Sequence, residues 1–192
     1  MTRLACLLAV GACSFLVACE TPDRDRVNEN TPISGPSGST GQGMDTQFLQ
    51  DAANSNHAEV MLGRLAMARA NHPDVRRFAQ MMMDDHGKAQ NDLLALARDQ
   101  GGTIEPQLGP DHRRLQDQLT RLQGAEFDRA YIDAMVKEHQ QAISKFENQV
   151  RSGRDVQVKN YAADTLSHLR HHLETARDIQ NRLSSGSGNN PN

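Results

Sequence analysis

Apolar residues recur every three or four positions from about residue 44 to residue 184, and charged residues fill the positions between them. A period near 3.6 residues indicates amphipathic helices that bury one face. No stretch of useful length alternates apolar and polar residues as a half-buried strand does. The pattern predicts four long helices and one short one: Asp45 or Thr46 to Ala70, Pro73 to Gln100, Pro110 to Leu122, Ala125 to Arg151, and from an Asp155 N-cap to Ser184.

Residues that favour helix ends set these boundaries. Proline is tolerated at a first helical position, so Pro73 starts the second helix. Gly101 and Gly102 can adopt left-handed geometry beyond its end, and Asp155 can accept hydrogen bonds at the start of the last helix. Short links favour antiparallel neighbours. The expected fold is therefore all-α: an up-down-up-down antiparallel four-helix bundle, with the short extra helix between helices two and three.

Four polar residues interrupt the apolar stripes of the long helices: Glu59, His86, His139 and His172. Each lies within about three residues of the expected midpoint of its helix, or about 4 Å at 1.5 Å per residue. Mid-helix residues of similar-length helices share one level in an up-down bundle. The four side chains are therefore expected to converge on one point.

One glutamate and three histidines are suitable ligands for a single Zn, Fe or Mn ion. Asp85 and Glu138 each precede an inward histidine, and each is a candidate hydrogen-bond acceptor that would fix the tautomer of a ring. The alternative is a polar layer without metal, in which these groups satisfy one another or hold a small ligand. The sequence leaves both interpretations open.

The remaining histidines and methionines are weaker candidates. His168 precedes His172 by four residues, a spacing that can bind metal, but its position favours a solvated helix edge. The consecutive residues Met81–Met83 point in different directions, which argues against a copper site. Three further histidines fall at helix starts or on polar faces, where exposure is expected: His57, His72 and His112.

Composition narrows the classes of function. The formal net charge is −3 and charges of both signs are interspersed, so no basic patch suggests a nucleic-acid partner. The chain has no Gly-rich phosphate loop, no Ser/His/Asp order and no reactive thiol in the helical region. These observations favour a non-enzymatic protein. A partner-binding module is a further alternative, which a contiguous exposed apolar patch would indicate.

The first nineteen residues are typical of an export signal. One positive charge, Arg3, precedes an apolar run that is too short for a membrane-spanning helix and resembles the core of a signal peptide. The run ends in Leu16-Val17-Ala18-Cys19, which resembles the lipobox of bacterial lipoproteins, where the chain is cleaved before the cysteine and lipid joins its thiol. All three cysteines lie within this segment, so no disulfide framework is expected in the helical domain.

The expected anchor sets the expected location. Several acyl chains on Cys19 would hold the protein firmly to a membrane, because one chain alone binds only marginally. Glu20 follows the cysteine where signals for inner-membrane retention usually have Asp, so the resemblance favours the outer membrane, facing the periplasm. The expected organisation is a signal peptide (1–18), a lipidated cysteine with a flexible tether (19–43), the helical bundle (44–184) and a disordered tail (185–192).

Several short motifs, spread over residues 45 to 182, resemble one known family, the ferritin-like bacterial domain of unknown function numbered forty-one forty-two. The motifs are Phe48-Leu49 with Ala52-Ala53, Glu59-Val60, Leu65-Ala66, Phe78 to Met82 with Asp85-His86, Phe127 to Tyr131, Met135-Val136 with His139, and Leu166 with Leu169 and His172-Leu173.

The resemblance implies a ferritin-like four-helix bundle, with Glu59, His86, His139 and His172 as its recurring polar positions. Members of the family are typically secreted or lipid-anchored, and the resemblance brings no established reaction. Di-iron ferritins pair Glu-x-x-His on two helices, whereas the residues three before these histidines are Met83, Val136 and Leu169. The expected function is a lipid-anchored periplasmic bundle with a role in envelope maintenance or stress, or a metal-binding protein or mononuclear metalloenzyme.

Overall fold

The computed structural model describes the backbone of residues 39–186 and the side chains of residues 45–185. The expected signal peptide, Cys19, most of the expected tether and the end of the tail lie outside the described residues. The described part is all-α, as predicted, with five helices and no strand: α1 (Ser39–Arg69), α2 (Pro73–Asp99), α3 (Pro110–Thr120), α4 (Gly124–Ser152) and α5 (Val156–Gly186). None of these helices is both long enough and apolar enough to span a membrane.

Helices α2 to α5 begin and end within two residues of the expected positions, because local signals define their ends. The imidazole of His72 caps α2 by accepting a hydrogen bond from the backbone N–H of Asp74. Beyond the end of α2, Gly101 has a φ of 74°, the left-handed geometry that glycine adopts without strain. The carboxylate of Asp155 accepts backbone N–H groups at the start of α5.

Helix α1 begins earlier than its sequence indicates. It starts at Ser39, where the pattern predicted a start at Asp45 or Thr46. The additional segment, residues 39–44, contains two glycines, whose low helix propensity obscured the helix. A formed helix extends at the cost of ordering one residue per added hydrogen bond, so weak helix formers can join its end.

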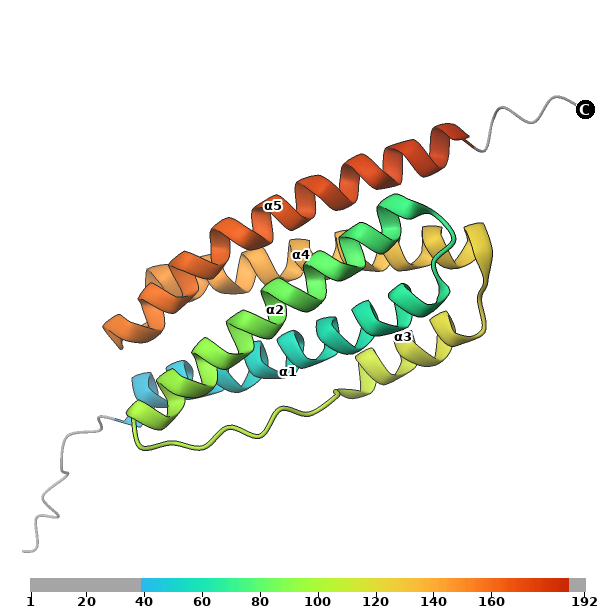
Figure 1. Cartoon of the computed structure of the whole chain (residues 1–192). Coiled ribbons are helices and arrows are strands. Elements are labelled where there is room, and N and C mark those ends of the chain that lie inside the picture. Colours follow the sequence, from blue (N-terminus) through green and yellow to red (C-terminus); the bar gives the residue numbers. More distant parts are fainter. Residues whose placement is uncertain (1–38, 187–192) are drawn as a thin grey trace, which may run out of the picture. The chain divides into compact units, whose positions relative to one another are not determined.

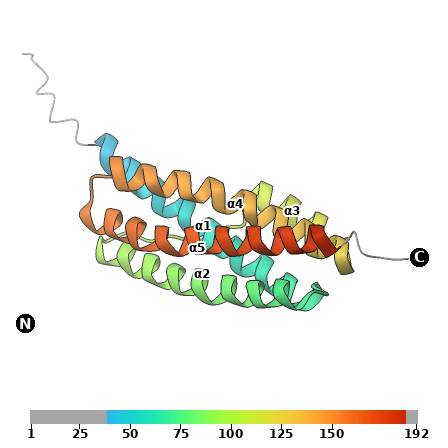
Figure 2. The same cartoon turned by 90° about the horizontal axis from the view of Figure 1, so that it is seen from above.

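The long helices pack most extensively in two pairs, α1 with α2 and α4 with α5 (Figure 1). Across the pairs, α2 also contacts α5 and α1 contacts α4, while the short α3 lies against α1 and α4. Seen from above, α5 runs between α2 and α4 (Figure 2). The two pairs therefore enclose a common core.

Two separate apolar clusters fill this core. One is centred on Phe78, Phe127 and Tyr131, and the other on Leu49, Phe146 and Leu166. On every long helix, the residues of the two clusters lie on opposite sides of the helix's middle. The buried polar residues of the helix middles therefore form a layer between the clusters: Asn56, Glu59, His86, His139 and His172.

Two buried aspartates fasten the pairs to each other at the helix links. Asp128 on α4 accepts hydrogen bonds from the backbone N–H groups of Asn71 and His72, just before α2. Asp45 on α1 accepts the N–H groups of Arg154 and Asp155, just before α5. Helix α4 therefore holds the link between α1 and α2, and helix α1 holds the link between α4 and α5. These bonds satisfy backbone donors that have no partner at a helix start.

Candidate metal centre

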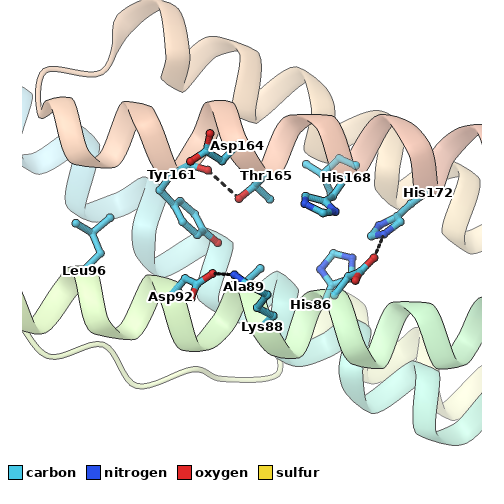
Figure 3. Close-up of a pocket in the computed structure, with 12 residues that line it drawn as sticks. His86, Lys88, Ala89, Asp92, Leu96, Tyr161, Asp164, Thr165, His168 and His172 are labelled. Carbon is cyan, nitrogen blue, oxygen red and sulfur yellow. Dashed lines mark hydrogen bonds and ion pairs between the residues drawn. The ribbon is translucent and has the colours of Figure 1, made fainter.

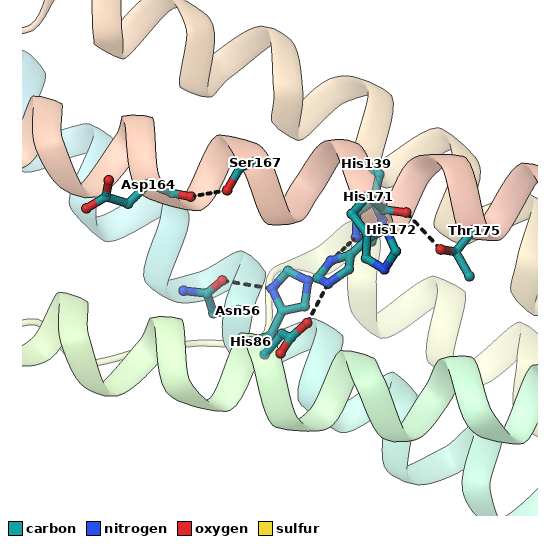
Figure 4. A network of polar contacts seen from close by, with 9 residues as sticks. Asn56, His86, His139, Asp164, Ser167, His171, His172 and Thr175 are labelled. Carbon is teal, nitrogen blue, oxygen red and sulfur yellow. Dashed lines mark hydrogen bonds and ion pairs between the residues drawn. The ribbon is translucent and has the colours of Figure 1, made fainter.

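Three of the four predicted side chains converge in the polar layer. Each of His86, His139 and His172 offers one ring nitrogen, and these three nitrogens all lie within 4.8 Å of one another. The rings are buried and their centroids are 5.3 to 5.6 Å apart (Figure 4). They come from α2, α4 and α5, because each histidine replaces an apolar residue on the inward stripe of its helix.

Two of the rings are oriented by acceptors outside the cluster. The Nδ1–H of His139 donates to the main-chain oxygen of Met135, at 2.9 Å. The Nδ1–H of His86 donates to Oδ1 of Asn56, at 3.0 Å. The Asn56 amide is itself oriented, since its Nδ2 donates to the hydroxyl of Tyr161 at 3.2 Å. A carbonyl oxygen can only accept, so each Nδ1 carries the ring proton.

The third ring is oriented by a carboxylate. Nε2 of His172 lies 2.8 Å from Oδ2 of Asp85, which is on α2. An ionised carboxylate can only accept, so Nε2 of His172 carries the proton and its Nδ1 holds a lone pair. The sequence indicated Asp85 as an acceptor for a ring. The structure pairs it with a histidine from another helix, not with its neighbour His86.

The inner nitrogens consequently all hold lone pairs. Nε2 of His86 is buried and has no hydrogen-bond partner among residues 45–185. Nε2 of His139 and Nδ1 of His172 face each other at 3.3 Å, and neither carries a proton when the outer nitrogens donate as described. Two lone pairs at this separation repel each other unless a proton or a cation lies between them. Three buried histidines whose rings are oriented by outer hydrogen bonds make this cluster a candidate cation site.

Burial makes a proton an unfavourable occupant. Desolvation lowers the pKa of His86 well below 6.5, and the neighbouring rings lower it further. Desolvation and the proximity of His172 lower the pKa of His139 to about 4. The pKa of His172 is also lowered, chiefly by burial, although Asp85 partly opposes the effect. All three imidazoles are therefore neutral at pH 7, the form that binds metals.

Glu59 does not join the three histidines, contrary to the expected convergence of four. The midpoint of α1 was predicted too late in the sequence, because the helix begins earlier than expected. The midpoint of the observed helix is Asn54, so Asn56 lies about 3 Å from the helix centre and Glu59 about 7.5 Å, at 1.5 Å per residue. Asn56 takes the place at the level of the histidines and contacts His86.

Glu59 instead forms a second buried polar position beside Tyr131. Burial raises the pKa of Glu59 to about 8, and repulsion from Glu138 adds to the shift. Burial also raises the pKa of Tyr131, with a contribution from Glu59. Neither Oε2 of Glu59 nor the hydroxyl of Tyr131 has a hydrogen-bond partner within the described part of the chain. Glu59 is therefore a neutral acid at pH 7.

Glu138 was expected to orient a ring of the metal centre, but the structure pairs it with a histidine outside the centre. Its carboxylate lies 3.4 Å from Nε2 of His112 on α3, and this contact lowers the pKa of Glu138. Successive helical residues point about 100° apart, so the residue before an inward histidine faces a neighbouring helix.

The three histidines expected at exposed positions are half-buried: His57, His72 and His112.

A cavity of about 370 Å³ lies beside the histidines, between α2 and α5 (Figure 3). His86 and His172 form part of its wall. His168 also lines it and is exposed, so the expected solvated edge is found at the rim of the site. The cavity connects two of the three rings to the surface.

Asn56 and Tyr161 are the site residues that the sequence did not identify. An amide on the apolar stripe of α1 is the sequence signal that could have revealed the role of Asn56. Tyr161 gave no comparable signal, because it contacts Asn56 from a helix 105 residues away in sequence.

Solved structures with a similar fold were found at low sequence identity. A DUF305 protein from Streptomyces coelicolor has a TM-score of 0.65 at 14% identity, with 73% of this chain and 92% of that chain covered. A DUF305 fragment from Deinococcus radiodurans gives 0.64 at 17% identity, with 72% and 96% covered. CopM in its Cu(II)-bound form gives 0.63 at 15% identity, with the same coverage. These likenesses show the fold.

A comparison with curated proteins gave no match. The family model of the domain of unknown function DUF4142 matches residues 31–179. This range includes all the residues of the polar layer and all five helices, apart from the end of α5. The resemblance seen in the sequence motifs is thereby confirmed. The chain belongs to the DUF4142 family, whose name assigns it no function.

Proposed function

We propose that this protein binds a single transition-metal ion through His86, His139 and His172, and that it is a metal-binding protein without a catalytic role. One observation carries the proposal: each ring donates through one nitrogen to a fixed acceptor, its other nitrogen holds a lone pair, and one nitrogen from each ring lies within 4.8 Å of the other two. A purely structural polar layer would pair these inner nitrogens with donors.

The donor set fits ions that imidazole prefers. Two ligand nitrogens on a tetrahedral zinc ion are about 3.3 Å apart when the Zn–N bonds are about 2.0 Å. The separation between Nε2 of His139 and Nδ1 of His172 is 3.3 Å. Imidazole ligands suit Zn, Cu, Fe and Ni. Two solved forms of CopM hold Cu(II) and Ag, so copper and silver join Zn, Fe and Mn as ions to test.

The proposal includes the location and arrangement of the protein. An up-down-up-down antiparallel, ferritin-like bundle would stand on the tether after a lipidated Cys19, at the outer membrane facing the periplasm. The lipobox-like Leu16–Cys19 supports the anchor, and the Streptomyces protein of similar fold is described as a candidate secreted protein. A role in envelope maintenance would then consist of holding or buffering the ion.

Elemental analysis of the full-length chain tests the proposed metal. The protein, stripped with a chelator and offered Zn²⁺ or Cu²⁺ in separate samples, is expected to retain one equivalent of an ion after desalting. His139→Ala should lose it, because the remaining two rings cannot enclose the ion. His171→Ala is the matched control, since His171 is exposed on α5. A wild type that retains far less than one equivalent of every ion tested would contradict the proposal.

Cell fractionation tests the anchor separately. Cys19→Ser is expected to release the protein from the membrane fraction, because the thiol that would carry the lipid is absent. Cys13→Ser is the control, since Cys13 would leave with the signal peptide. Continued membrane retention of the Cys19 variant would exclude the lipid anchor and leave the metal proposal intact.

The partner-binding alternative has little support from the described surface. Two large apolar side chains are exposed among residues 45–185, Met67 on α1 and Val156 at the start of α5. Two isolated residues do not form the contiguous patch that marks a protein interface.

A further inference from the structure

We infer that the metal ion enters and leaves the centre through the cleft between α2 and α5, and that the exposed His168 is the first side chain to bind it there. This inference rests on the proposed function, because it assigns the route and a transient ligand for the same ion. The probe is a divalent cation that prefers nitrogen ligands, such as Zn²⁺ or Cu²⁺.

The cleft leads directly to the centre. Its cavity of about 370 Å³ is walled by His86 and His172. Nε2 of His86 is buried, has no hydrogen-bond partner in the described part of the chain and belongs to a ring on this wall. The cavity of about 540 Å³ between α1 and α4 is larger, but none of the three histidines lines it. The α2–α5 cleft is therefore the opening that offers an ion an unused ligand nitrogen.

The charges of the cleft favour a cation. Three aspartates and one lysine line it. Lys88 Nζ is paired with Asp92 at 2.6 Å, which leaves Asp85 and Asp164 as uncompensated negative groups on the wall. Asp85 also accepts the hydrogen bond from His172. A cleft with excess charge of one sign concentrates ions of the opposite sign and accelerates their association.

His168 connects solvent with the buried rings. It lies one helical turn before His172 on α5, and the ring centroids are 6.5 Å apart. Figure 3 shows its ring extending from α5 into the cleft, towards His86. Two histidines four residues apart on one helix can share a metal ion. An ion bound at His168 can therefore be passed to His172 without returning to bulk water.

His171 provides a matched control on the same helix. Its ring centroid is 6.3 Å from that of His172, and it is exposed like His168, but it does not line the cleft. The two residues thus match in type, helix and distance to His172. A difference between the metal-exchange rates of their variants would therefore result from the position of each residue relative to the cleft.

Stopped-flow mixing of the metal-free full-length chain with Zn²⁺ and a chromophoric chelator measures the rates. His168→Gln is expected to slow both association and dissociation several-fold and to retain one equivalent at equilibrium. His171→Gln should behave like the wild type. Equal rates for His168→Gln and the wild type would overturn the inference, as would equal slowing in both variants. Loss of the bound ion in His168→Gln would also overturn it, since His168 would then be a permanent ligand.

A steric variant tests the route without changing a histidine. Ala89 on α2 lines the cleft and is half-buried, so Ala89→Leu should narrow it and slow exchange. Ala142→Leu, in the cavity between α1 and α4, is the control. Circular dichroism would verify the helical content of both. Unchanged exchange in a folded Ala89→Leu would exclude the route. If instead the wild type holds no ion, the proposed function itself fails, and the route with it.

Discussion

Buried carboxylates occur in two kinds of surroundings in this bundle. Asp45 and Asp128 lie at the helix links, and each accepts at least two backbone N–H groups. Asp45 also accepts the side-chain Nε2 of Gln149 at 2.6 Å. Glu59 lies in the middle of the bundle, where its Oε2 has no partner among the described residues. All three side chains are almost completely buried.

The difference lies in the donors that each group receives. A carboxylate that accepts several N–H groups has its oxygens satisfied and fixes the chain around it. A carboxyl group buried without donors keeps its proton, as the raised pKa of Glu59 indicates. A helix middle has no free backbone N–H groups, because each already bonds to the preceding turn. Polar groups there must therefore satisfy one another or remain unsatisfied.

Each of the three histidines has both kinds of surroundings within one ring. Their outer nitrogens bond to Met135, Asn56 and Asp85, as a structural residue would. Their inner nitrogens carry no proton and so cannot donate hydrogen bonds to one another. The candidate metal ligands therefore lie on the inner side of the polar layer.

Removal of a link clamp should destabilise the fold strongly. Asp128→Ala should lower the free energy of unfolding by about 3 kcal/mol, because the N–H groups of Asn71 and His72 would lose their acceptor. Urea denaturation measures the change. Arg129→Ala, a change at the exposed neighbouring residue of the same helix, should alter stability by less than about 0.5 kcal/mol. Equal effects of the two substitutions would show that the clamp is not structural.

The metal centre should contribute stability independently of the clamps. An ion that binds only the folded state stabilises it by about 2.7 kcal/mol at a hundredfold excess over its Kd. Asp128→Ala should retain this increment, and His139→Ala should lack it. Urea denaturation with and without Zn²⁺ measures both. An increment that survives in His139→Ala would place the ion elsewhere.

Glu59 should make the protein less stable as the pH rises. Its folded pKa is raised to about 8 from 4.5, so between these values the unfolded chain releases a proton that the folded chain keeps. The contribution is fully present below pH 4.5 and falls by about 1.4 kcal/mol per pH unit up to about pH 8. Glu59→Gln, which cannot titrate, should lose this slope.

The difference in unfolding free energy between wild type and Glu59→Gln isolates this effect, measured in chelator at several pH values. The histidines have lowered pKa values, so they destabilise the fold only when the pH falls below their ordinary value of 6.5. Above that value the slope belongs to Glu59. Parallel pH profiles of the two proteins would mean that Glu59 is ionised in the folded state.

The smallest expected effect concerns the hydrogen bond that orients His172. Asp85→Ala should weaken the affinity for Zn²⁺ about tenfold, because the ring loses the acceptor that fixes its tautomer. The stoichiometry should stay at one equivalent. Asp84→Ala, at the exposed neighbouring position of α2, is the control. Competition with a chelator of known affinity measures both, and equal affinities would show that Asp85 does not orient the ring.

The helical fold and the histidine layer follow from local patterns in the amino-acid sequence. A periodic apolar stripe defines each inward face, so His86, His139 and His172 were identified as buried before any contact was known. Local signals such as Pro73 and Asp155 located most of the helix ends. This information is carried by neighbouring residues, within a few turns of one helix.

The level of α1 in the bundle and the partners of each ring depend on how the helices pack against one another. The glycines after Ser39 hid the true start of α1, and this error placed Glu59 where Asn56 lies. The bonds from Asp85 to His172 and from Tyr161 to Asn56 join separate helices, so they depend on how the helices are rotated and shifted against one another. Periodicity fixes which face of a helix is buried. It does not fix the register between helices, because apolar packing has no direction and tolerates small shifts.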